Sequence, residues 1–165
     1  MRYARRLTRK LLPDLAGTLA ELSTALKSEI AATPVTPAVI HGDLYEGQVM
    51  VGADFSLALL DLDDLGMGDP ALDAASFCAH LLALADTHPA AAPRILAYRA
   101  LLRERFLARF DVGERGFAAR ESLVMLQLAS GPFRVLEERW PERVRRRVEL
   151  AQGLLTDWNR LERAG

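Results

Sequence analysis

Residues 41–73 read HGDLYEGQVMVGADFSLALLDLDDLGMGDPALD, and this stretch decides the fold and the chemistry that the sequence indicates. It holds eight carboxylates and no Lys or Arg. Acidic groups that lie close together disfavour ionisation of one another unless a cation or many hydrogen-bond donors compensate. The stretch is therefore either a solvated acidic surface or a site for a cation. Its carboxylates are Asp43, Glu46, Asp54, Asp61, Asp63, Asp64, Asp69 and Asp73.

Two apolar runs within this stretch predict a β-hairpin. They span residues 48–51 and 56–61, and the turn Gly-Ala-Asp-Phe separates them. Residues 38–41 favour a third short strand. One acid-bearing loop, residues 41–48, leads into the hairpin, and a second, residues 59–66, leaves it. Because strand ends hold carboxylates at fixed positions, we expect the two loops to converge on one hard cation such as Mg²⁺.

Three polar side chains in these loops are candidates for accepting a proton or binding a cation. Asp43 lies in a polar loop, where a carboxylate can accept a proton from a hydroxyl group. Gln48 follows five residues later and can offer an amide oxygen to a cation. Asp61 stands where the second apolar run ends. A proton acceptor next to a cation site is the pattern that these residues predict.

Outward from this stretch the sequence is helical. Upstream, an apolar stripe of leucines predicts an amphipathic helix within residues 2–32, which Pro13 interrupts, and TPVTP (33–37) is a connector. Downstream, Ala, Leu and Phe dominate, and Pro or Gly separates the segments. We therefore predict a mostly helical α+β fold that forms a single domain over residues 1–165. The stripe is Leu15, Leu19, Leu22 and Leu26, and the four downstream helices are expected at 71–85, 90–110, 116–139 and 141–163.

The composition is that of an ordinary globular protein. Of the 165 residues, 50% are hydrophobic and 26% are charged, and Cys78 is the one cysteine, so a disulfide framework is excluded. We find neither the features of a signal peptide nor an apolar run long enough to span a membrane, and we expect a cytoplasmic protein. The net charge of −1 conceals an uneven distribution of charge. Residues 1–88 carry 6 basic and 12 acidic side chains, whereas residues 89–165 carry 15 basic and 10 acidic side chains.

Two motifs in the acidic stretch resemble those of the aminoglycoside phosphotransferase and choline kinase family, whose members share the protein-kinase-like fold. The catalytic loop of that family has the form His-Gly-Asp-x-x-x-x-Asn, and this chain has HGDLYEGQ at 41–48. The family's metal segment is an apolar strand that ends in Asp, followed by Gly-x-x-Asp-Pro-x-x-Asp, and this chain has LLDLDDLGMGDPALD at 59–73. The resemblance is strong over residues 37–76 and implies a kinase that phosphorylates hydroxyl groups of small molecules.

The resemblance also implies roles for individual residues. Asp43 would be the catalytic base, and Asp61 would bind Mg²⁺ on the phosphates of ATP. Gln48 stands where the family has a metal-binding Asn, and its side chain is one methylene longer.

Four further residues would support these three. His41 would orient the catalytic loop. Asp69 and Asp73 match positions that connect the metal segment to neighbouring helices, so their expected role is structural. Asp63 would either assist at the metal or face water. His80, by contrast, is expected to be an ordinary packing or surface residue.

The sequence before the catalytic loop shapes the expected organisation. Residues 1–36 contain neither a Gly-rich phosphate loop nor a strand lysine, so we expect only the C-terminal lobe of a kinase-like fold, without its nucleotide lobe. The resemblance implies that residues 90–163 would form the acceptor pocket. Their surplus of basic side chains favours a neutral or anionic hydroxyl compound over a polycationic aminoglycoside.

Two hypotheses for the function remain open. One is a small-molecule phosphotransferase that uses ATP and Mg²⁺. The other is a non-catalytic interaction module, or pseudokinase lobe, which pairs with a separate N-terminal-lobe chain or with a second copy. We expect neither a membrane nor a nucleic acid as partner. The basic residues Arg2, Arg5, Arg6, Arg9 and Lys10 are candidates for the contact with the partner chain or the second copy.

Overall fold

A computed structural model describes residues 10–162, with side chains up to Thr156. It is mostly helical and has two small two-stranded sheets, which confirms the α+β class. Backbone contacts divide the chain into two compact units, one containing residues 1–34 and 113–165 and the other containing residues 35–112. Arg2, Arg5, Arg6 and Arg9 lie outside the described residues, and the single domain stays a prediction. In the described part of the chain, no helix combines the length and apolarity that a membrane span requires.

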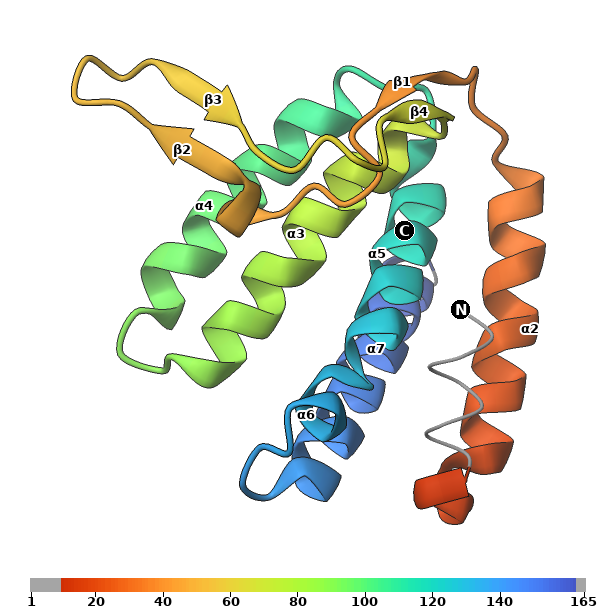
Figure 1. Ribbon diagram of the computed structural model, residues 1–165. Helices are drawn as coiled ribbons and strands as arrows, with labels where there is room; N and C mark the ends of the chain where they lie inside the picture. The colour runs from red at the N-terminus through yellow and green to blue at the C-terminus, as the bar shows by residue number, and fades with distance from the viewer. Residues whose placement is uncertain (1–9, 163–165) are drawn as a thin grey trace. The chain divides into compact units, whose positions relative to one another are not determined.

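The second unit contains both sheets, and they are built from four three-residue strands (Figure 1). The expected hairpin is present, with Val49 opposite Leu59. The expected third strand also forms, and its antiparallel partner is the Gly-Met-Gly segment, which we did not predict to be a strand. This pairing brings the two acidic loops to the same end of one sheet. In chain order the elements are β1 (Ala38–Ile40), η2 (Glu46–Gln48), β2 (Val49–Val51), β3 (Leu57–Leu59) and β4 (Gly66–Gly68).

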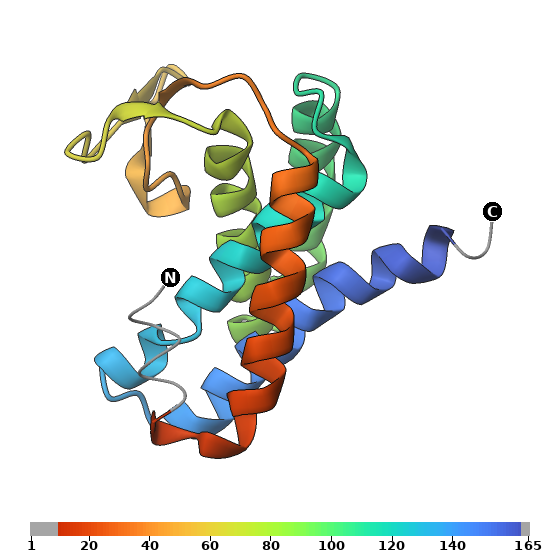
Figure 2. The same ribbon diagram turned by 90° about the vertical axis from the view of Figure 1, so that its right-hand side faces the viewer.

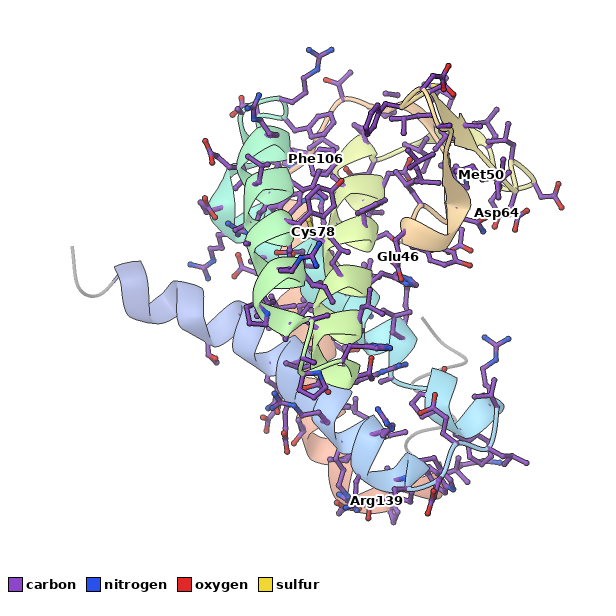
Figure 3. All side chains as sticks on the ribbon, turned by 90° about the vertical axis from the view of Figure 1, so that its left-hand side faces the viewer. Glu46, Met50, Asp64, Cys78, Phe106 and Arg139 are labelled. Atoms are coloured by element: carbon purple, nitrogen blue, oxygen red, sulfur yellow. The ribbon has the colours of Figure 1, made fainter. Side chains whose placement is uncertain are left out.

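Two antiparallel helices, α3 (Pro70–Thr87) and α4 (Ala92–Leu107), complete the second unit. Helix α3 begins at Pro70 because Asp69 caps it: the carboxylate accepts a hydrogen bond of 2.9 Å from the amide of Ala71. Small buried residues on α3 let α4 approach closely, and the guanidinium of Arg99 donates to the carbonyl of Cys78. Figure 3 shows Cys78 on α3 and Phe106 on α4. The predicted helix at 71–85 is confirmed.

The first unit is a helical bundle in which α5 packs against both α2 and α7 (Figure 2). Three of the four residues of the expected apolar stripe lie in its core, since Leu19, Leu22 and Leu26 are buried together with Phe117 and Met125 of α5, whereas Leu15 precedes α2 and is partly exposed. Burial of these side chains is the main stabilising contribution to such a bundle. Its elements are η1 (Pro13–Leu15), α2 (Ala16–Ala32), α5 (Gly113–Leu128), α6 (Gly131–Arg134) and α7 (Trp140–Glu162).

The expected helix at 116–139 was wrong in its extent, because two helices occupy this segment. Helix α5 ends at Leu128 and the short α6 begins at Gly131. Pro132 lies at the start of α6, where its missing amide hydrogen costs no helical bond. Further inside a helix the same ring would clash with the preceding turn. Five helices therefore follow the hairpin within the described residues, where we expected four.

A buried arginine joins two helices of the first unit. Arg120 on α5 is only 1% exposed. Its guanidinium donates to the carbonyl of Thr33 at 2.8 Å, to the hydroxyl of Thr33 at 3.1 Å and to the carbonyl of Gly116 at 2.9 Å. Thr33 is the C-cap residue of α2, so the positive charge lies at the negative end of that helix dipole. Nothing in the sequence indicated this contact, because Arg120 is one of several arginines in predicted helices.

We expect Arg120→Met to lower the free energy of unfolding by about 3 kcal/mol, because it leaves the end of α2 without its buried charged donor. Urea titration followed by circular dichroism measures this change. Arg109→Met is the matched control, since Arg109 is exposed on the protein surface. Equal unfolding midpoints for the two variants would show that the buried contact contributes no stability.

Candidate active site

The two acidic loops touch at a glycine. Gly42 has a φ of +88°, a conformation that favours glycine. A Cβ atom at this position would lie 2.7 Å from the carbonyl oxygen of Asp64 and 2.9 Å from its Cβ. A side chain would therefore push the loops apart. The absence of a side chain at Gly42 allows the loop after β1 to contact the loop after β3.

The ring of His41 connects the same two loops. His41 is only 4% exposed, and its Nε2 atom lies 2.8 Å from the carbonyl oxygen of Leu60. A carbonyl oxygen only accepts hydrogen bonds, so Nε2 carries a hydrogen. The Nδ1 atom is buried and has no hydrogen-bond partner among the described residues. Because Leu60 directly precedes Asp61, the ring of His41 holds the backbone at the start of the second acidic loop.

Asp73, in the first turn of α3, holds the first loop from its other side. One carboxylate oxygen accepts from the amide of His41 at 2.6 Å, and the other accepts from the amide of Gly42 at 3.0 Å. Hydrogen bonds to a charged acceptor are short and about twice as strong as neutral ones. Two consecutive amides are thus fixed directly before Asp43.

We expect Asp73→Leu to lower the free energy of unfolding by about 2 kcal/mol and to expose the amide of Gly42 to hydrogen exchange, because two amides lose a charged acceptor. Asp73→Asn keeps one acceptor oxygen and should lose less. Urea titration and amide exchange measured by NMR test both effects. As a control, Asp111→Leu changes an exposed aspartate of the same unit. Unchanged exchange at Gly42 in Asp73→Leu would contradict this account.

Gln48 and Asp61 meet across the base of the hairpin. The Nε2 atom of Gln48 lies 3.3 Å from Oδ2 of Asp61. The amide of Leu60 also donates to the carbonyl of Gln48 at 2.9 Å, so the ladder of the hairpin extends to this point. Asp61 has a φ of +54°, a left-handed conformation that Asp and Asn tolerate better than most residues do. The contact leaves one oxygen of each side chain available to another ligand.

The remaining acidic residues have different surroundings. Asp43 and Asp63 are exposed and form no hydrogen bond with another described residue, so Asp43 is open to a substrate. Asp63 lies in the turn that follows Asp61, and Asp69 caps α3. The structure thus brings Gln48 to Asp61 and brings Asp73 to the catalytic loop. The catalytic and metal-binding roles of these residues stay predictions.

A divalent cation fits this site only as part of a larger ligand set. No group of three or more His, Cys, Asp or Glu among the described residues is arranged to hold a metal ion. Mg²⁺, however, commonly takes one or two protein oxygens and completes its shell with water and substrate phosphates. The free oxygens of Asp61 and Gln48 are the hard ligands that this mode requires. The donor set fits Mg²⁺ bound together with phosphates.

One contact at the site was not expected from the sequence. The rings of Tyr45 and His80 stack, with centroids 4.6 Å apart and an interplanar angle of 23°. We had expected His80 to be an ordinary packing or surface residue. Its partner lies in a distant segment, and no periodicity or motif connects the two positions.

Comparison with known proteins gives the family of this chain. The sequence model described as the phosphotransferase enzyme family matches residues 1–107, which include all the site residues named above. Searches of curated proteins and of solved structures gave no match. The match extends over more than half of the 165 residues and includes both acidic loops. The chain therefore belongs to the phosphotransferase enzyme family.

Proposed function

We propose that this chain carries the catalytic loop and the metal loop of an ATP-dependent kinase that phosphorylates a small-molecule hydroxyl. The observation that carries the proposal is the contact of Gln48 with Asp61 at 3.3 Å, which joins the two acidic loops at one point. Family membership and the exposure of Asp43 support it. The same features favour the C-terminal lobe of a kinase-like fold as the architecture.

In the proposed reaction, the carboxylate of Asp43 orients the substrate hydroxyl and accepts its proton. The hydroxyl oxygen bonds to the γ-phosphorus of ATP, and the bond from that phosphorus to the β–γ bridging oxygen breaks, which releases ADP. Asp61 and Gln48 would hold Mg²⁺, which when bound neutralises charge on the phosphates. His41 and Asp73 keep the backbone before Asp43 in place through the hydrogen bonds described above.

For the acceptor we propose a neutral or anionic hydroxyl compound. Residues 89–165 carry 15 basic and 10 acidic side chains. An excess of positive charge repels a polycation and attracts an anion, over a range that salt shortens. A sugar or a sugar phosphate fits this charge better than an aminoglycoside does.

The proposal is tested by incubating the full chain with γ-labelled ATP, Mg²⁺ and a panel of acceptors. The panel contains neutral sugars, sugar phosphates, amino alcohols and aminoglycosides. We expect label to be transferred to a neutral or anionic member and the transfer to stop when EDTA removes the metal. A chain that neither binds Mg·ATP nor labels any acceptor would contradict the proposed activity.

A second candidate function, that of an interaction module, is favoured by the hairpin. Its apolar side chains are exposed, with Phe55 at 86%, Leu57 at 71% and Val51 at 63%. A contiguous exposed apolar surface on a soluble protein often marks a contact with another protein. The partner would be a separate N-terminal-lobe chain or a second copy. Two measurements distinguish the functions. For an interaction module, light scattering should show that the Asp61→Asn variant assembles as the wild type does. Calorimetry should then show no Mg²⁺-dependent binding of ATP.

A further inference from the structure

The ring of Tyr45 lies against both the η2 turn and helix α3. It stacks on the ring of His80, with centroids 4.6 Å apart. It also occupies the space beside Gly47, where a Cβ atom would come within 2.5 Å of the Cε2 atom of Tyr45. The stack and this close packing attach a three-residue turn to a helix of the same unit. In Figure 3, Glu46 marks the position of this turn.

The backbone of Tyr45 holds the same turn. Its carbonyl accepts a hydrogen bond of 3.0 Å from the amide of Gln48. Gln48 is the last residue of η2, and β2 begins directly after it. Tyr45 is thus held through its ring by His80 and, through its carbonyl, holds the residue whose side chain reaches Asp61. A movement of the ring would be transmitted to Gln48 over one short turn.

A glutamine at this position needs such support. Its side chain has three rotatable bonds, and fixing it costs more conformational entropy than fixing a shorter polar side chain. The backbone of Gln48 must therefore be well placed if its amide is to meet Asp61. We infer that Tyr45 and His80 are positioning residues for Gln48 and that their ring stack sets the affinity of the metal site. This inference rests on the proposed function, which takes Gln48 as a metal ligand.

The test measures uptake of Mn²⁺, a spectroscopic substitute for Mg²⁺, by the full chain in the presence of ADP, using electron paramagnetic resonance. Tyr45→Leu is expected to weaken Mn²⁺ binding about three- to tenfold, which corresponds to the loss of one aromatic pair. His80→Leu should have a similar effect, and it replaces Tyr45→Leu as the test if that variant does not fold. Tyr45→Phe keeps both rings and should bind Mn²⁺ as the wild type does.

A matched control separates this effect from the general loss of an aromatic contact. Phe106 and Phe110 also stack in the second unit, with centroids 6.3 Å apart. Phe110→Leu removes that pair without a change at η2. It should leave Mn²⁺ affinity unchanged, even where it lowers the melting temperature as much as Tyr45→Leu does.

An independent readout uses the metal-free protein. The side-chain amide resonances of Gln48 should shift in Tyr45→Leu and stay in place in Phe110→Leu. The inference is overturned, while the proposed function stands, if the wild type takes up Mn²⁺ with ADP and Tyr45→Leu matches it in both readouts. A wild-type chain that takes up no Mn²⁺ with ADP overturns the proposed function, and with it the role assigned to the ring stack.

Discussion

Asp43→Asn is expected to lower kcat for phosphoryl transfer by about 100- to 10,000-fold, the usual contribution of a positioned general base. Asn has nearly the same size as Asp but accepts no proton at neutral pH. Asp43 forms no hydrogen bond with another described residue, so the change should leave the surrounding structure intact. Affinity for Mg·ATP should stay within about twofold, because the expected metal ligands are Asp61 and Gln48. Transfer kinetics with saturating acceptor measure kcat, and calorimetry measures the affinity.

The control for this variant is Asp111→Asn, which neutralises an exposed aspartate of the same unit. It should retain wild-type kcat, because it removes the same charge at a position that lies far from the acidic loops in the sequence. A kcat for Asp43→Asn within tenfold of the wild type would show that another group accepts the proton. Loss of Mg·ATP binding in Asp43→Asn would instead place this carboxylate at the phosphates.

The hairpin could be predicted because its signal is local. Apolar runs flank a turn, and both strands lie within a few residues of it. The partner of β1 could not be predicted in the same way. Gly66-Met67-Gly68 has two glycines, which are disfavoured in strands, and it becomes a strand only because β1 pairs with it. That non-local pairing brings the acidic loops together.

The contacts within the site follow from the same pairing. The sequence motif indicated which residues belong to the site, among them His41 and Asp73, but not which atoms meet. The bond from the ring of His41 to Leu60 depends on how the loops meet, and this is set by the register of β1 against β4. The stack of Tyr45 on His80 depends on how α3 packs. Neither contact leaves a periodic or compositional signal in the sequence.

The fold compensates only part of the acidic charge between residues 41 and 73. Asp73 accepts two backbone amides, and Asp69 caps α3. Ser56 donates hydrogen bonds that hold the pKa of Asp54 below its ordinary value. Among the described residues, Asp61 accepts only from the neutral amide of Gln48. Its surroundings therefore supply less compensation than those of Asp73, and unlike the exposed Asp43 and Asp63 it lies beside Gln48, the other proposed metal ligand.

This difference leads to the prediction for Asp61→Asn, which should weaken Mg²⁺-dependent binding of ATP by at least about 100-fold. Loss of a residue that only supports a metal ligand already costs 10- to 100-fold in metal affinity, and a direct ligand should cost more. Asn tolerates the left-handed conformation of Asp61, so the backbone should be preserved. Calorimetric titration of ATP with and without Mg²⁺ measures the change, and the melting temperature reports on the fold.

Asp111→Asn again serves as the matched control and should bind Mg·ATP as the wild type does. Asp63→Asn addresses the question that the sequence left open, because Asp63 follows Asp61 closely and is exposed. If it assists at the metal, its loss weakens binding as well; if it faces water, its loss changes little. Wild-type affinity for Mg·ATP in Asp61→Asn would show that the contact between the two acidic loops serves structure alone, and the exposed apolar hairpin would then favour the interaction module.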